Sequence, residues 1–168
     1  LDREYLGTFE VGTHVSEAKN GSQGFVSYYY TLIDDMIVRF PTGELIDGLP
    51  EVTKDNVGDG FVHGVELGLS WNFYRGFTAF GALTWTNGEV DNYTAPGIQE
   101  SAPISRLQPT TGLLGLRWES EHKRYWVEFS TQIVDDQSRL SPRDESDTQR
   151  IPPGGTPGYT VYNLRGGV

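Results

Sequence analysis

The side chains that most resemble chemical machinery are two pairs of adjacent carboxylates and three histidines. They are Asp34-Asp35, Asp135-Asp136, His14, His63 and His122. Carboxylates act as general acids or bases only in a pocket with a positioned partner, and both pairs lie where a predicted strand enters a loop. The histidines are far apart and lack metal-site spacing such as H-E-x-x-H. The sequence therefore predicts no enzyme, no catalytic residue, no metal site and no cofactor.

A second group of side chains has the chemistry to bind an anion. Arg139, Arg143 and Arg150 lie in one long loop, interspersed with carboxylates. Guanidinium groups form charge-assisted hydrogen bonds with anionic ligands, so we interpret these arginines, with Tyr93 from the preceding long loop, as candidate ligand-binding residues. The alternative is that the loop charges are solvated and pair with one another.

Composition excludes several classes of protein. A chain of 168 residues is long enough for one domain with a sizeable core. The absence of Cys excludes a disulfide scaffold, a zinc–thiolate site and thiol catalysis. A formal charge of −10 argues against a nucleic-acid partner, because phosphate contacts need a basic face. No stretch approaches the ~20 apolar residues of a membrane-spanning helix, but a span by β-strands leaves average hydropathy low.

Alternation of apolar and polar residues indicates which elements position these side chains. In residues 61–73 the odd positions are almost all apolar or aromatic, and the even positions are mostly small or polar. Side chains alternate across a strand, so one face is apolar and the other polar. Similar patterns occur in residues 9–15, 25–38, 77–85, 111–119, 125–134 and 159–168. Three successive tyrosines leave the facing of residues 25–38 open. The chain is predicted to be all-β, an antiparallel up-and-down meander of about seven strands.

The connections between these strands alternate in length. Short ones are predicted at residues 16–23, 73–76 and 120–123, and long ones at 39–57, 87–109 and 135–157. This alternation places all the long loops at one end of the sheet, as in outer-membrane barrels with short periplasmic turns and long outer loops. The long loops are rich in Gly and Pro, so we expect extended backbone without regular pairing.

The strand count sets a constraint on closure. Single-chain bacterial barrels close with an even number of strands, and about seven would leave two edges open, which lipid does not tolerate. The chain is therefore either an incomplete part of a transmembrane β-barrel or a different fold. The main alternative is a secreted β-sandwich carbohydrate-binding module, in which the apolar faces would be buried against a second sheet. A passive porin-like channel is a third reading.

Five sequence segments carry recognisable strand and loop motifs: residues 9–13 (FEVGT), 28–37 (YYYTLIDDMI), 56–67 (NVGDGFVHGVEL), 103–109 (PISRLQP) and 150–159 (RIPPGGTPGY). In this order they resemble the C-terminal part of a TonB-dependent receptor barrel. The resemblance covers nearly the whole chain. It implies that residues 1–168 form a partial barrel segment of a larger receptor, with no plug domain present.

The resemblance also implies a function and partners. The expected function is energy-coupled uptake, in the bacterial outer membrane, of a scarce ligand such as a ferric siderophore or haem. The expected partners are outer-membrane lipid, the plug domain and remaining strands of the same receptor, TonB through the absent N-terminal part, and the small-molecule ligand. Iron is preferred only by analogy with the family.

Overall fold

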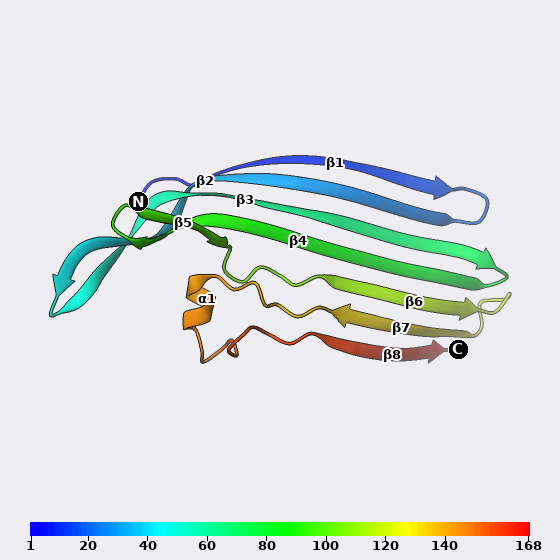
Figure 1. The fold of residues 1–168 in the computed structure, drawn as a ribbon. Helices are drawn as coiled ribbons and strands as arrows, with labels where there is room; N and C mark the ends of the chain where they lie inside the picture. The colour runs from blue at the N-terminus through cyan, green and yellow to red at the C-terminus, as the bar shows by residue number, and fades with distance from the viewer.

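The computed structural model describes residues 1–168 as one antiparallel sheet (Figure 1). Its elements are β1 (Tyr5–Glu17), β2 (Ser22–Ile46), β3 (Leu49–Tyr74), β4 (Phe77–Ala95), β5 (Ile98–Pro103), β6 (Thr111–Glu119), β7 (Trp126–Val134), α1 (Pro142–Ser146) and β8 (Tyr159–Gly167). The sheet has eight strands in the order β1-β2-β3-β4-β6-β7-β8, and β5 pairs only with β4. The predicted meander is confirmed, with β5 and the single turn of α1 as additions.

Strand register places the apolar residues on one continuous face. Leu67 on β3 lies opposite Val26 on β2 and Leu83 on β4. The same face continues through Leu116 on β6, which lies opposite Phe129 on β7. Register also settles the facing of the three tyrosines. Tyr28 and Tyr30 pair with positions of this apolar face, whereas Tyr29 does not and lies on the opposite, polar face.

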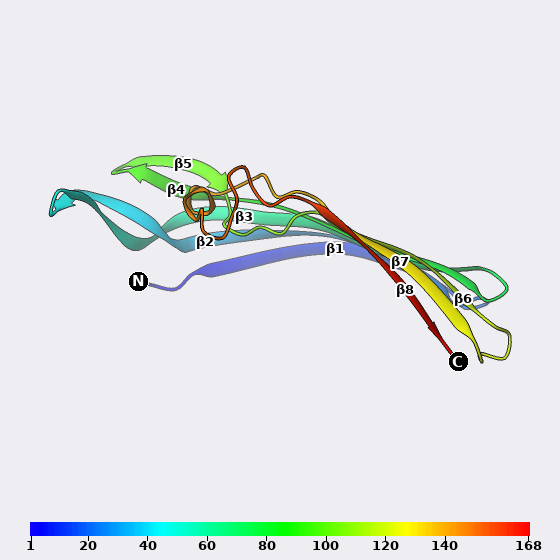
Figure 2. The same cartoon turned by 90° about the horizontal axis from the view of Figure 1, so that it is seen from below.

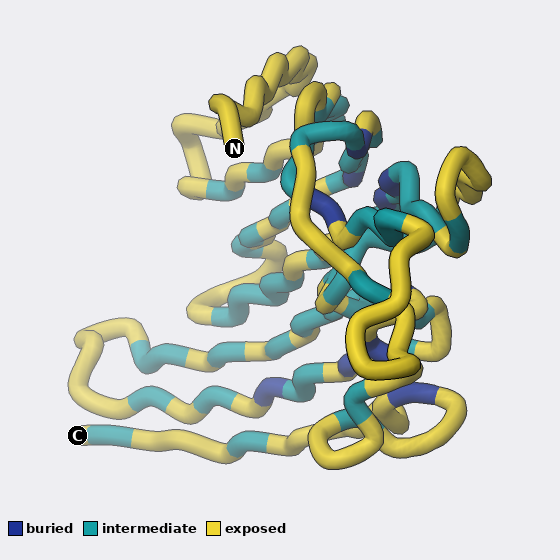
Figure 3. The backbone as a smooth tube through the Cα atoms, turned by 90° about the vertical axis from the view of Figure 1, so that its left-hand side faces the viewer, coloured by how far each residue is buried: buried dark blue, intermediate teal, exposed yellow.

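No second sheet covers this apolar face. Leu69 and Trp71 are each 52% exposed and Leu114 is 59% exposed, and only 10 of the 168 residues are buried (Figure 3). In a β-sandwich these side chains would be buried between two sheets. The structure therefore contradicts the sandwich alternative, and it leaves an apolar face of the kind that meets lipid.

The opposite face is polar and partly ion-paired. Arg117 on β6 lies 3.5 Å from the Glu128 carboxylate on β7, and its guanidinium stacks 4.3 Å above the centre of the Trp126 ring. On the first two strands, the Ser27 hydroxyl donates to the Glu10 carboxylate at 2.6 Å. These contacts satisfy charges that would otherwise stand unpaired along the strands.

The two ends of the sheet differ, as predicted. The short turns after β1, β3 and β6 lie at one end, and the long connections after β2, β4 and β7 lie at the other (Figure 1). The sheet is curved and does not close, so β1 and β8 are both open edges (Figure 2). No helix in the structure has the length and apolar character needed to cross a membrane.

The expectation that the long loops lack regular pairing is wrong for the first two. Residues 39–57 mostly continue β2 and β3 as a paired ribbon up to the Ile46–Leu49 pair, and residues 89–103 form the β4–β5 hairpin. Each hairpin turns on a glycine with positive φ, Gly48 at 82° and Gly97 at 74°, where glycine adopts the required backbone without strain. The third long loop is irregular except for α1 and one bridge between Gln137 and Thr156.

Candidate functional site

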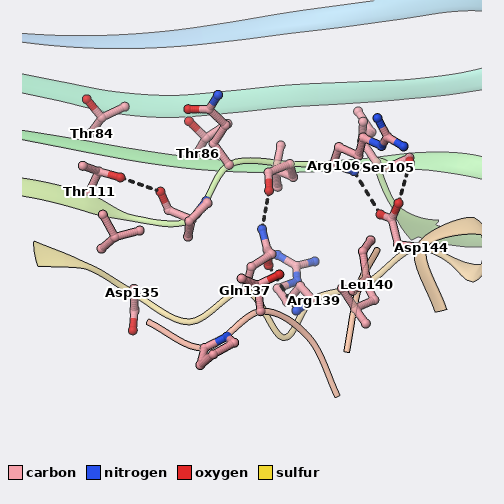
Figure 4. Close-up of a pocket in the computed structure, with 18 of the residues that line it drawn as sticks. Thr84, Thr86, Ser105, Arg106, Thr111, Asp135, Gln137, Arg139, Leu140 and Asp144 are labelled. Carbon is pink, nitrogen blue, oxygen red and sulfur yellow. Dashed lines mark hydrogen bonds between the residues drawn. The ribbon is translucent and has the colours of Figure 1, made fainter. Parts of the chain in front are cut away.

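The largest hollow lies on the polar face, where the third long loop folds back over the strands (Figure 4). Its volume is about 920 Å³. Its floor comes from polar-face positions of β3, β4, β6 and β7, including Glu66, Thr84, Thr86 and Gln132, and its wall comes from residues 104–109 and 135–157. A hollow of this size accommodates a small molecule.

A second, smaller hollow of about 420 Å³ lies between α1 and the long-loop ends of β2, β3 and β4.

Asp144 fixes the third long loop against the segment that precedes β6. Its two carboxylate oxygens accept hydrogen bonds from the Ser105 hydroxyl at 2.7 Å and from the Arg106 backbone N–H at 2.9 Å. Asp144 lies in α1, whose N-cap Ser141 accepts a hydrogen bond from the Asp144 backbone N–H at 3.1 Å. Asp144 is only 4% exposed, so these bonds satisfy a charge that is shielded from water.

The hydrogen bonds also decide the protonation of this carboxyl group. Burial by itself raises the pKa of Asp144, because it disfavours the charged form. The bonds from Arg106, Ser105 and Ser141 favour the charged form and together outweigh burial, so the pKa lies below its usual value of 3.8. The carboxylate is therefore ionised at neutral pH and acts as a structural acceptor.

Gln137 holds the base of the same loop. Its side-chain amide donates to the Leu107 carbonyl at 2.5 Å. Its backbone exchanges two hydrogen bonds with Thr156, at 2.9 and 3.1 Å, which brings the two ends of the loop together. The loop is thus closed on itself and attached to residues 104–109.

Arg139 attaches the loop to β4. Its guanidinium group lies 2.8 Å from the Glu89 carboxylate and also donates to the Asn87 side-chain oxygen. The Asn87 amide in turn lies 3.3 Å from His63 Nε2. Arg139 therefore lines the hollow, but a carboxylate of this chain already neutralises its charge.

The remaining polar groups suit recognition of a small molecule. The Tyr29 and Thr86 hydroxyls lie 3.1 Å apart in the floor of the hollow, and Glu66 makes no hydrogen bond or ion pair through its carboxylate. No group of three or more His, Asp or Glu side chains is placed to hold a metal ion. The arrangement offers hydroxyls and charges for binding a ligand without covalent chemistry.

The structure separates the four candidate residues chosen from the sequence. Arg139 lines the large hollow, whereas Arg143 and Tyr93 line the second one. Arg150 lines neither and lies 3.6 Å from the Asp147 carboxylate. The Tyr93 hydroxyl donates to the Val57 carbonyl at 3.1 Å, so part of its polar chemistry supports the sheet.

Sequence reasoning missed Asp144 and Gln137 as the residues that shape the hollow. A local signal existed for Asp144: Ser141-Pro142-Arg143-Asp144 has an N-cap serine, proline at the first helical position and an acidic residue in the first turn. No local signal identifies Gln137, because its partner Leu107 lies 30 positions away.

Comparison with known proteins agrees with this architecture. The family model described as "TonB dependent receptor-like, beta-barrel" matches residues 1–168. The chain therefore belongs to the TonB-dependent receptor-like β-barrel family. No curated protein matches the sequence.

A solved structure shares the fold. The chain is similar to "Copper transporter OprC" with a TM-score of 0.70 and 18% sequence identity. The similarity covers 97% of this chain and 22% of that one, so the chain spans about a fifth of the transporter's length. At this identity the likeness concerns the fold alone.

Proposed function

We propose that this chain forms part of the barrel wall and the ligand-facing loops of a larger outer-membrane receptor for energy-coupled uptake of a scarce small molecule. The observation that supports this most is the two-faced sheet. One face is a continuous exposed apolar surface, and the other carries a polar hollow of about 920 Å³ beneath the long-loop end. A lipid-facing outside and a polar inside are what a barrel wall requires.

The proposed partners follow from this assignment. Outer-membrane lipid would cover the apolar face, and other strands of the same receptor would pair with the open edges of β1 and β8. The plug domain would face the polar side, and TonB would act through a part of the receptor outside this chain. None of these partners is a nucleic acid, which agrees with the formal charge of −10.

Two classes of cargo are proposed. A ferric siderophore or haem is favoured by analogy with the family, and copper is the second candidate because the structural neighbour is named a copper transporter. The test is uptake of ⁵⁵Fe-labelled ferric siderophore, ⁵⁵Fe-labelled haem and ⁶⁴Cu by cells with the complete receptor. Uptake of one cargo that stops when TonB is deleted supports the proposal. TonB-independent uptake of all three would contradict it.

Topology provides a test that needs no knowledge of the cargo. Because the chain has no Cys, single cysteines can be placed at exposed long-loop positions Glu44, Glu100 and Arg150, and at turn positions Arg75 and Glu121 as controls. We expect a membrane-impermeant maleimide to label the first three in whole cells and not the two controls. Labelling of the turns instead would invert the assignment of the long loops to the outside.

A further inference from the structure

The second hollow has an unusual charge. It measures about 420 Å³ and lies between α1 and the long-loop ends of β2, β3 and β4. Arg39 from β2, Lys54 from β3 and Arg143 from α1 line it. No carboxylate lines it, although acidic residues outnumber basic ones by 23 to 13 in the chain. Positive charge is thus concentrated here against the overall balance.

These three cations lack partners within the chain. The ion pairs of the structure all use other arginines. Arg39 and Lys54 are direct cross-strand partners, and like charges in that position destabilise a strand pair. An anion bound between them would remove this repulsion.

Neutral side chains around the cations can add hydrogen bonds to an anion. Thr94 and Asn92 from β4 also line the hollow, and the Asn92 amide donates only one of its two N–H groups within the chain, to the Val90 carbonyl. The Thr94 hydroxyl makes no hydrogen bond within the chain, so it is free to donate. A guanidinium group binds two oxygens of a phosphate at once, and an ammonium group binds as a point charge.

We propose that this hollow binds a phosphate-type oxyanion through Arg39, Lys54 and Arg143. The anion would bridge the β2–β3 ribbon and α1, because the three cations come from these two separate segments. The site goes beyond the proposed receptor function, since it needs neither cargo nor TonB. It shares only Ser105 with the large hollow, and the Ser105 hydroxyl is already bonded to Asp144.

The test is calorimetric titration of inorganic phosphate into the complete receptor in detergent at low salt. We expect saturable binding that weakens about tenfold in Arg39→Gln and in Arg143→Gln, because each loses a charge-assisted hydrogen bond. Arg150→Gln is the matched control, since Arg150 lies in the same loop, outside the hollow. All three positions are exposed, and unchanged heat-modifiable mobility on gels confirms that the variants fold.

Two outcomes would overturn the proposal. They are absence of saturable phosphate binding to the unmodified receptor, and equal weakening by Arg150→Gln. Hydrogen exchange adds an independent readout, because a bridging anion must slow exchange in both the β2–β3 ribbon and α1. Protection of neither segment at saturating phosphate would also contradict the proposal.

The phosphate group has two potential sources, free phosphate and a lipid headgroup. The titration is repeated in nanodiscs of phosphatidylcholine with and without phosphatidic acid. Weaker apparent binding in phosphatidic acid nanodiscs indicates that headgroups compete for the site, and unchanged binding indicates that free phosphate is the ligand. Failure of cargo uptake leaves these measurements unaffected, so the two proposals fail separately.

Discussion

Substitution of Leu67 by arginine tests the assignment of faces most directly. Leu67 lies on the apolar face of β3, 36% exposed, between the aromatic residues His63 and Trp71 of the same face. It is four residues from each, or about 13 Å along the strand at ~3.3 Å per residue. Leu67 therefore lies near the middle of the apolar band, where lipid surrounds the strand.

An arginine at this depth should cost about 2–4 kcal/mol of unfolding free energy in a bilayer. Thr84→Arg is the matched control, because Thr84 lies on the polar face of β4, directly opposite Glu66 on β3. There the new guanidinium can pair with the Glu66 carboxylate, and we expect a change below ~1 kcal/mol. The measurement is urea unfolding of the complete receptor in phospholipid vesicles, followed by tryptophan fluorescence. Equal destabilisation by the two variants would refute the face assignment.

Three further predictions concern contacts within the sheet and the third long loop. Stability contributed by Asp144 should be present above about pH 3.8 and lost as pH falls through its lower folded pKa, so hydrogen exchange of α1 should rise in acid, but less so in Asp144→Asn. Gly115→Ala should cost about 1–3 kcal/mol, because its Cβ would overlap the Phe80 ring, whereas Gly7→Ala meets no atom within 4 Å and should be near neutral in urea unfolding. Tyr93→Phe should cost about 1 kcal/mol in the same assay, since it removes one hydrogen bond, and no loss would show that the bond contributes nothing.

The strands and their faces could be predicted because alternation is a local property. Residues 61–73 carry it in nearly every position, and the structure confirms the face that they define. The ribbon of residues 39–57 was missed because Pro41, Gly43 and Pro50 interrupt the alternation. The Asp47-Gly48 turn signal was nevertheless present, with both residues at positive φ, 53° and 82°.

The arrangement of the site could be predicted only in part, because its contacts join distant positions. Sequence proximity suggested that the loop arginines pair with neighbouring carboxylates, and Arg150 does so with Asp147. Arg139 instead pairs with Glu89, 50 positions away, because strand order brings β4 beneath the third long loop. Such partners depend on register and loop path, which no local pattern specifies.

The three long connections should therefore differ in how they respond to a ligand. Asp144, Gln137 and Arg139 attach the third loop to the strands or to residues 104–109 at three separate points. The β2–β3 ribbon extends beyond the sheet and is held mainly by its own pairing, with Tyr93 as one of its contacts to β4 (Figure 2). Segments with fewer contacts open at lower free energy. Movement on ligand capture is thus expected in the ribbon, while the third loop keeps the shape of the hollow.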